Sequence, residues 1–320
     1  MDIFGLIMWP FKIVIEAILV AWHWLFSVVG IPAESGIGWI LSIVGLVVVV
    51  RSAMIPLMVK QIKSQRIMME ISPELKRLQE KYKGKTDRFS REQMAREQME
   101  LYSKRGTSPF SSCLPILVQM PVFFGLFTVL NEAGKGQAGV GLLTEELAKG
   151  FANAKLIGAP LSETLSGQFN VADPNWAVVV MAAVLVALMV STQFYTQLQI
   201  MGRNVSPETK ASPMFKQQRM LLYVLPFMMV FSGVAFPLGL VFYWFVSNLW
   251  TMVQQFIVIR NMPNPGSEAD LARIERLRRK GILVEDEKTA SGELEDAPKR
   301  GQRQQPTRKN RGKGPKKKGS

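Results

Sequence analysis

The segment from Ile37 to Met58 constrains this chain most, because it is apolar over the length of a membrane span and contains one charge, Arg51. A helix that crosses a bilayer needs about 20 apolar residues. If this helix ends near Lys60, Arg51 lies about 13 Å inside that end at 1.5 Å per residue. An arginine at such depth costs about 2.5–3.5 kcal/mol on insertion scales. Arg51 must therefore either extend its stem to the headgroups or face a polar cavity that marks a functional site.

Composition agrees with a membrane protein that carries basic extensions. Of the 320 residues 48% are hydrophobic, and the formal net charge is +14. The single cysteine, Cys113, excludes an internal disulfide, and His23 forms no zinc-ligand spacing with it. Gly134, Gly136 and Gly139 match G-x-G-x-x-G, but no strand precedes them, so we interpret them as a flexible loop. We predict no metal, no cofactor and no enzymatic activity.

Five apolar segments predict an all-α polytopic membrane protein. The predicted transmembrane helices cover residues 37–59, 111–131, 175–199, 220–236 and 238–260. The remaining parts are an N-terminal segment (1–36), a charged helical hairpin (60–110), a loop (132–174), a second loop (200–219) and a basic tail (261–320) that is expected to be disordered beyond about residue 285. Lys12, Glu16 and His23 interrupt the N-terminal segment, which favours an amphipathic helix on the membrane surface, although cleavage or spanning stays open.

Capping and turn residues predict where the helices outside the membrane begin and end. Ser72 followed by Pro73 predicts the cap and first residue of a helix. Ser90 and Gln93 form a capping-box pattern for the second hairpin helix, and Gly106 predicts its end. Another short helix is expected over residues 267–280, with acids at its start and bases at its end.

The charge distribution predicts the orientation. Residues 60–105 contain 13 Lys or Arg and 7 Asp or Glu, whereas residues 131–173 contain 5 acids and 3 bases. The positive-inside rule therefore places the hairpin, the second loop and the tail in the cytoplasm, and the N-terminus outside. Residues 299–320 hold ten Lys or Arg and no acid, which suits ribosomal RNA or anionic lipid, although a merely solubilising tail is also consistent.

Polar side chains recur at helical spacing within the apolar segments, where unpaired amides are costly. The candidates are Gln119, Gln193, Thr196, Trp244, Asn248 and Gln254. These side chains either form interhelical hydrogen bonds or, together with Arg51, line a water-accessible groove. We favour the groove and predict that these residues and Arg51 bind substrate.

Several motifs resemble the YidC family of membrane-protein insertases. SSCLPILVQMP over residues 111–121 is similar to the family's second-span signature, and residues 236–255 are similar to its last-span signature. Arg51 with Pro56 resembles the arginine of its first core span, and residues 73–82 its cytoplasmic hairpin. The five-span form without a large outer domain resembles the actinobacterial branch of Gram-positive bacteria.

This resemblance implies a protein of the bacterial plasma membrane that guides hydrophobic segments of nascent membrane proteins from the cytoplasm into lipid. It implies a hydrophilic groove open to the cytoplasm and to lipid, in which Arg51 attracts acidic residues of the substrate. It also implies partnership with the Sec translocon and, through the tail, with the ribosome, beside anionic lipids. The alternatives are a small-solute transporter that uses Arg51 as an anion site and a membrane tether for ribosomes.

Overall fold

The computed structural model describes residues 3–108, 114–210 and 213–281, and this part is mostly helical, which confirms the all-α class. The helices are α1 (Ile3–Val28), α2 (Gly36–Glu70), α3 (Ser72–Lys81), α4 (Arg88–Lys104), α5 (Leu114–Gly134), α6 (Glu145–Asn153), α7 (Leu165–Gln168), α8 (Trp176–Arg203), α9 (Pro207–Lys210), α10 (Pro213–Ala235), α11 (Leu238–Asn261) and α12 (Glu268–Arg279). Strands β1 (Lys155–Leu156) and β2 (Ala159–Pro160) pair antiparallel, with Lys155 opposite Pro160.

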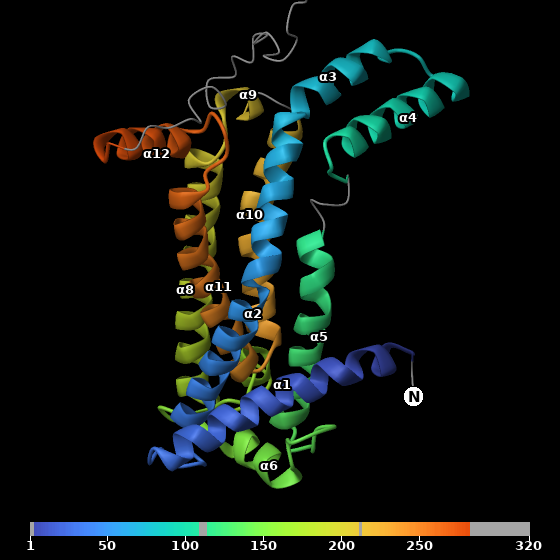
Figure 1. Ribbon diagram of the computed structural model, residues 1–320. Coiled ribbons are helices and arrows are strands. Elements are labelled where there is room, and N and C mark those ends of the chain that lie inside the picture. Colours follow the sequence, from blue (N-terminus) through green and yellow to red (C-terminus); the bar gives the residue numbers. More distant parts are fainter. Residues whose placement is uncertain (1–2, 109–113, 211–212, 282–320) are drawn as a thin grey trace, which may run out of the picture.

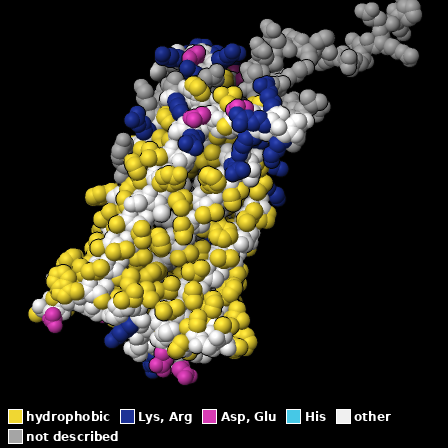
Figure 2. All heavy atoms as spheres, turned by 90° about the vertical axis from the view of Figure 1, so that its left-hand side faces the viewer, with side chains coloured by type: hydrophobic (Ala, Val, Ile, Leu, Met, Phe, Trp, Pro, Cys, Tyr) yellow, Lys and Arg dark blue, Asp and Glu magenta, His cyan; other side chains and the backbone are white. Residues whose placement is uncertain are grey.

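The long helices form an upright bundle with a folded layer at each end. Figure 1 shows α2, α5, α8, α10 and α11 running along one direction, with α1 lying across one end above α6. The hairpin of α3 and α4, together with α9 and α12, lies at the opposite end. In Figure 2 an apolar belt covers the middle of the visible face, and Lys and Arg side chains gather at the end that carries the hairpin. This pattern is typical of a protein whose middle lies in lipid.

Length and composition identify three helices in the described residues as able to cross a membrane. They are Gly5–Val28 of α1, Gly36–Met68 of α2 and Trp176–Arg203, which is all of α8. The apolar run of α10, Pro226–Ala235, is shorter. The five-span arrangement therefore stays a prediction, in which α5, α10 and α11 cross beside α2 and α8. Although α1 is long enough to span, it lies across the bundle, as a helix on the membrane surface would.

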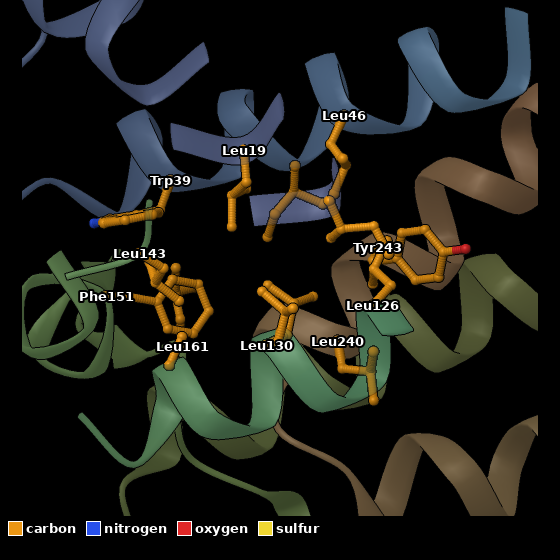
Figure 3. Close-up of a cluster of buried hydrophobic side chains, with 14 of the residues drawn as sticks. Leu19, Trp39, Leu46, Leu126, Leu130, Leu143, Phe151, Leu161, Leu240 and Tyr243 are labelled. Carbon is orange, nitrogen blue, oxygen red and sulfur yellow. The ribbon is translucent and has the colours of Figure 1, made fainter. Parts of the chain in front are cut away.

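The main core joins α1, α2, α5, α6 and α11 near the end where α1 lies. Figure 3 shows its side chains pointing toward one another from helices far apart in sequence. The buried members include Leu19, Trp39, Leu46, Leu126, Leu130, Leu143, Phe151, Leu161, Leu240 and Tyr243. A second cluster joins α7, α8 and α11 around Val178, Met189 and Leu238. Burial of this apolar surface holds the helices together at this end of the bundle.

The prediction of a flexible loop over residues 132–174 is wrong. The segment folds into α6, the β1–β2 hairpin and α7, and Thr144 caps α6 by accepting a hydrogen bond from the Leu147 amide at 3.3 Å. The start of α11 is joined to this segment, because the Leu238 amide donates a hydrogen bond to the Glu163 carbonyl. Phe151 lies in the main core. Short elements of this kind depend on the surface beneath them, which periodicity within the segment does not reveal.

Two predicted caps of the hairpin are also wrong. Ser72 is the first residue of α3 and Ile71 occupies the cap position without a side-chain hydrogen bond, because α2 continues to Glu70 with almost no break. Asp87, rather than Ser90, caps α4, and its carboxylate accepts a hydrogen bond from the Ser90 amide at 2.8 Å. Both motifs were correctly recognised as helix starts, but a cap side chain acts two or three residues upstream of the amide that it binds.

The glycine pattern of residues 134–139 has a structural explanation. Gly136 has φ +69° at the turn after α5, and a Cβ on Gly139 would collide with the carboxylate of Glu16. Glu16 is fully buried and accepts hydrogen bonds from the amides of Val140, Gly141 and Leu143 at 2.9, 2.7 and 3.4 Å. The loop therefore does wrap an anion, but that anion is a carboxylate of this chain.

Candidate functional site

Arg51 lies on the face of α2 that packs against α11. Its guanidinium donates a hydrogen bond to the Ser247 hydroxyl, one turn along α11 from the buried Tyr243. Arg51 itself is half-buried. No carboxylate of the described residues lies within ion-pair distance of it. The positive charge of Arg51 is therefore hydrogen-bonded but not neutralised by an acid of the described chain.

The two helices are parallel at this contact. Arg51 meets Ser247, and seven residues further along each helix Met58 meets Gln254, whose amide donates to the Met58 sulfur at 2.7 Å. Seven residues are about two turns, or roughly 10 Å at 1.5 Å per residue. Gln254 also accepts a hydrogen bond from the Trp250 indole at 2.9 Å. One polar stripe of α11 thus lies along α2 from Arg51 toward the basic end.

Trp244 belongs to an aromatic cluster that joins α5 and α11. Its ring stacks on Phe123 of α5, with centroids 5.8 Å apart and planes 9° from parallel. Phe236 meets it edge-on at 5.3 Å, and Phe127 meets Phe236 in the same way at 5.5 Å. The cluster fixes α5 against α11 beside the arginine.

The other predicted residues lie on several helices and do not converge on one point. Asn248 donates to the Met229 sulfur of α10 at 3.4 Å, and the buried Thr196 donates to the Thr192 carbonyl of its own helix at 2.7 Å. Gln193 of α8 and Gln119 of α5 are half-buried. The structure therefore brings Arg51 and Gln254 onto one interface, whereas the remaining five stay separate candidates.

A cavity of about 520 Å³ opens on another side of α11, between α8, α11 and α12. Thr196 is the one predicted site residue among its lining side chains. Met252 and Ile259 also line it, each five residues beyond Ser247 or Gln254 and so about 140° around the helix from them. The Arg51 contact and this cavity are consequently separate places.

Ser247 is the functional candidate that the predicted set omits. It belongs to the polar series of the last apolar segment, but no local feature distinguishes it from Thr251, which instead donates to the Ser247 carbonyl at 2.9 Å. The available signal is spacing, because Ser247 precedes Gln254 by the same seven residues that separate Arg51 from Met58. Recognising it requires knowing that α2 and α11 are parallel.

The charged hairpin is held by its own ionic contacts at the basic end. Glu97 of α4 accepts hydrogen bonds from Lys81 and from the Tyr82 hydroxyl, each at 2.8 Å. Lys81 first, and Tyr82 second, lower the pKa of the Glu97 carboxyl, while the same contact raises the pKa of Lys81. Lys81 and Glu97 are exposed, so their ion pair orients the hairpin more than it stabilises it.

Comparison with known proteins decides the family. The family described as 60Kd inner membrane protein matches residues 31–265 of this chain. This chain belongs to that family. A protein of Tropheryma whipplei called membrane protein insertase YidC is 43% identical over 312 residues, which cover 96% of each chain. The family match includes the Arg51 contact, the hairpin and all of α11.

Two further relatives carry the same YidC name. The protein of Streptomyces avermitilis is 42% identical over 266 residues, covering 82% of this chain and 60% of its own length. The protein of Bifidobacterium longum is 33% identical over 304 residues, covering 90% and 89%. These relatives are actinobacterial, and the resemblance drawn from the span motifs is confirmed.

Proposed function

We propose that this chain, an insertase of the YidC family, guides hydrophobic segments of nascent membrane proteins from the cytoplasm into the bilayer and uses Arg51 as a transient partner for substrate acids. One observation carries the proposal: Arg51 lies half-buried within the bundle, bound to the neutral Ser247 hydroxyl and without an acidic partner among the described residues. A charge in that position is costly, and an incoming carboxylate would offset the cost.

The energetics favour a short-lived contact. A hydroxyl partner holds the guanidinium in place but can be exchanged for a carboxylate, whose charge-assisted hydrogen bonds are stronger. Water around Arg51 would screen the pair, so the substrate is also free to leave. Burial of the substrate's apolar segment in lipid then supplies most of the driving force, at about 25 cal/mol per Å². No covalent step is involved.

The path of the substrate is proposed to follow polar residues of α8 and α11. Gln193, Thr196, Trp244, Asn248 and Gln254, with Gln119 of α5, would line a hydrophilic groove that opens toward the basic end. Gln254 supports this role, because it prolongs the Arg51 contact toward that end. Asn248 and Thr196 already have protein partners, which suits helix–helix contacts equally well.

The orientation follows from charge. We place the end with α3, α4 and α12 in the cytoplasm and the N-terminus outside, since Lys and Arg gather at the former end in Figure 2. The chain would then span five times, with α1 on the outer surface. Cysteine-accessibility labelling of intact cells tests it: labelling of the hairpin from outside would contradict this orientation.

The partners are proposed from the tail and the family. The ten bases of residues 299–320 lie outside the described residues and would bind ribosomal RNA or anionic lipid. Removing residues 282–320 is expected to weaken ribosome co-sedimentation, and undiminished binding would contradict this role. Crosslinking of the chain to the Sec translocon during insertion tests the other partnership.

Reconstitution tests the central proposal. Proteoliposomes with Arg51→Lys are expected to retain most insertion of a single-span substrate whose translocated tail is acidic, whereas Arg51→Glu is expected to lose it, because like charges repel. Protection of the tail from added protease reports insertion. Ser247→Ala is the matched control, since it removes the hydroxyl but keeps the charge. Equal insertion by wild type and Arg51→Glu would remove Arg51 from the mechanism.

A further inference from the structure

The cavity beneath α12 has an apolar wall. It lies between the last turns of α8 and α11, and α12 crosses over these ends (Figure 1). Met252, Phe256 and Ile259 of α11 line it, together with Ala269 and Ala272 of α12. Its volume of about 520 Å³ is sufficient for a chain-like apolar group.

Arginines from three helices surround the same cavity. Arg203 ends α8, Arg260 lies in the last turn of α11, and Arg276 comes from α12. Arg276 donates to the Arg260 carbonyl at 2.6 Å, but neither Arg203 nor Arg260 pairs with a carboxylate of the described residues. Glu268 is the only acid among the lining residues. The cavity therefore combines an apolar wall with a positive rim.

Hydrogen bonds hold the cover of this cavity in place. Asn264, just before α12, donates from its backbone to the Asn204 side chain at 2.8 Å and from its side chain to the Asn204 carbonyl at 2.6 Å. Ser267 caps α12 and donates to the Asn264 carbonyl at 2.7 Å. Both asparagines are buried. The cavity is thus preformed, which lowers the entropic cost of binding a ligand.

We infer that this cavity binds one anionic phospholipid. The phosphate of this lipid lies between Arg203 and Arg260, and the part of an acyl chain nearest the headgroup lies along Phe256 and Met252. Guanidinium groups bind phosphate oxygens through paired hydrogen bonds, and helix ends lie at headgroup depth. This inference goes beyond the proposed function, because the ligand is a lipid and Arg51 takes no part. Thr196 is the one residue of the proposed substrate path that also lines the cavity.

The dimensions distinguish a lipid from a substrate helix. The lining residues extend from Tyr195 to Arg203 on α8 and from Met252 to Arg260 on α11. The ends of each stretch are eight residue steps apart, or about 12 Å at 1.5 Å per residue. A spanning segment needs about 30 Å of apolar surface. A free phosphate would bind the arginines without needing the apolar wall. A phospholipid matches both parts of the cavity at this depth.

Native mass spectrometry of the full chain, released from detergent, tests the inference. Phosphatidylglycerol is expected to remain bound in preference to phosphatidylcholine. The double variant Arg203→Gln with Arg260→Gln is expected to weaken that binding by roughly tenfold, as hydrogen bonds to a charged group are lost. Arg273→Gln is the matched control, because it removes one positive charge from α12 outside the cavity lining. The basic tail is present in every sample, so its contribution cancels.

Further outcomes decide between lipid and other ligands. Arg203→Lys with Arg260→Lys is expected to restore part of the binding, which separates lost charge from a misfolded helix end. Ala269→Phe, which narrows the cavity at its apolar wall, is expected to weaken phosphatidylglycerol binding without altering phosphate binding. Equal retention of both lipids, an unaffected double glutamine variant, or full displacement by inorganic phosphate would each overturn the inference. So would photocrosslinks from Phe256 to a stalled substrate in place of lipid.

Discussion

Glu16 and Arg51 are charged residues within apolar helices of this protein, and they are bound in opposite ways. Glu16 is fully buried and accepts three backbone hydrogen bonds, so the loop after α5 surrounds it completely. Arg51 is half-buried and donates to one neutral hydroxyl. A fully bound charge contributes to structure, whereas a charge with an exchangeable partner can bind something else. The comparison explains why Arg51, and not Glu16, is the functional candidate.

The largest expected effect concerns the Glu16 side of this comparison. Gly139→Ala would drive a Cβ into the Glu16 carboxylate, and Glu16→Ala would leave three amides without their acceptor. Each lost hydrogen bond to a charged group costs about 1.5–3 kcal/mol, so both variants are expected to unfold at clearly lower temperature. Thermal unfolding in detergent measures the unfolding temperatures of the two variants and the wild type.

Gly150→Ala is the matched control for this prediction. A Cβ on Gly150 meets no atom within 4 Å, so the unfolding temperature of the Gly150→Ala variant is expected to equal or exceed that of the wild type. If Gly139→Ala and Gly150→Ala unfold at the same temperature, the Glu16 contact does not stabilise the packing of α1 against the loop after α5.

A smaller effect is expected at Gln254, which tests how far the polar face beside Arg51 is open to water. With Cys113→Ser as background, a cysteine at Gln254 is expected to react faster with a polar thiol reagent than a cysteine at Leu240, which is 1% exposed. The same Gln254→Cys variant loses the contacts to Trp250 and Met58, which is expected to lower the free energy of unfolding by about 1 kcal/mol. Equal reaction rates would mean that Gln254 joins helices and lines no groove.

The smallest effect is expected in the hairpin, where charges pair in water. The pKa of Glu97 is lowered in the folded state, so its contribution to stability is present above the ordinary carboxyl pKa and is lost as pH falls through the lowered value. The protection of α3 and α4 amides from hydrogen exchange, corrected for the pH dependence of the intrinsic exchange rate, is expected to fall at acid pH in the full chain. Glu97→Gln is expected to reduce this pH dependence, whereas Glu92→Gln on the same helix is expected to retain it.

Much of the helical fold follows from local sequence, and the long-range contacts do not. Apolar runs and charge patterns predicted helices that overlap α2, α8, α11 and α12, although α2 continues to Glu70, eleven residues past the predicted end at residue 59. The cost of a buried charge made Arg51 a candidate. Glu16 and Lys12 share a helix face, yet each binds a partner more than a hundred residues away, Lys12 contacting Glu132 at 2.8 Å. Such pairings are properties of packing and have no local signature.

The site shows the same limit. Trp244 was predicted to line a groove, and its ring packs on aromatic residues of α5 and of the turn before α11. Ser247 became recognisable only once α2 and α11 were seen to run parallel. Polarity within an apolar segment indicates which residues need partners, while the packing of the helices determines whether each partner is water, substrate or another helix.

The most direct test of Arg51 is a charge cycle between protein and substrate. Wild type and Arg51→Gln are each compared on a substrate with an aspartate in its translocated segment and on the same substrate with asparagine. The membrane potential acts on the aspartate in both proteins, so it cancels in the cycle. We expect a coupling of about 1 kcal/mol or more between Arg51 and the aspartate in insertion yield or rate. Strictly additive effects would contradict a direct role for the Arg51 charge.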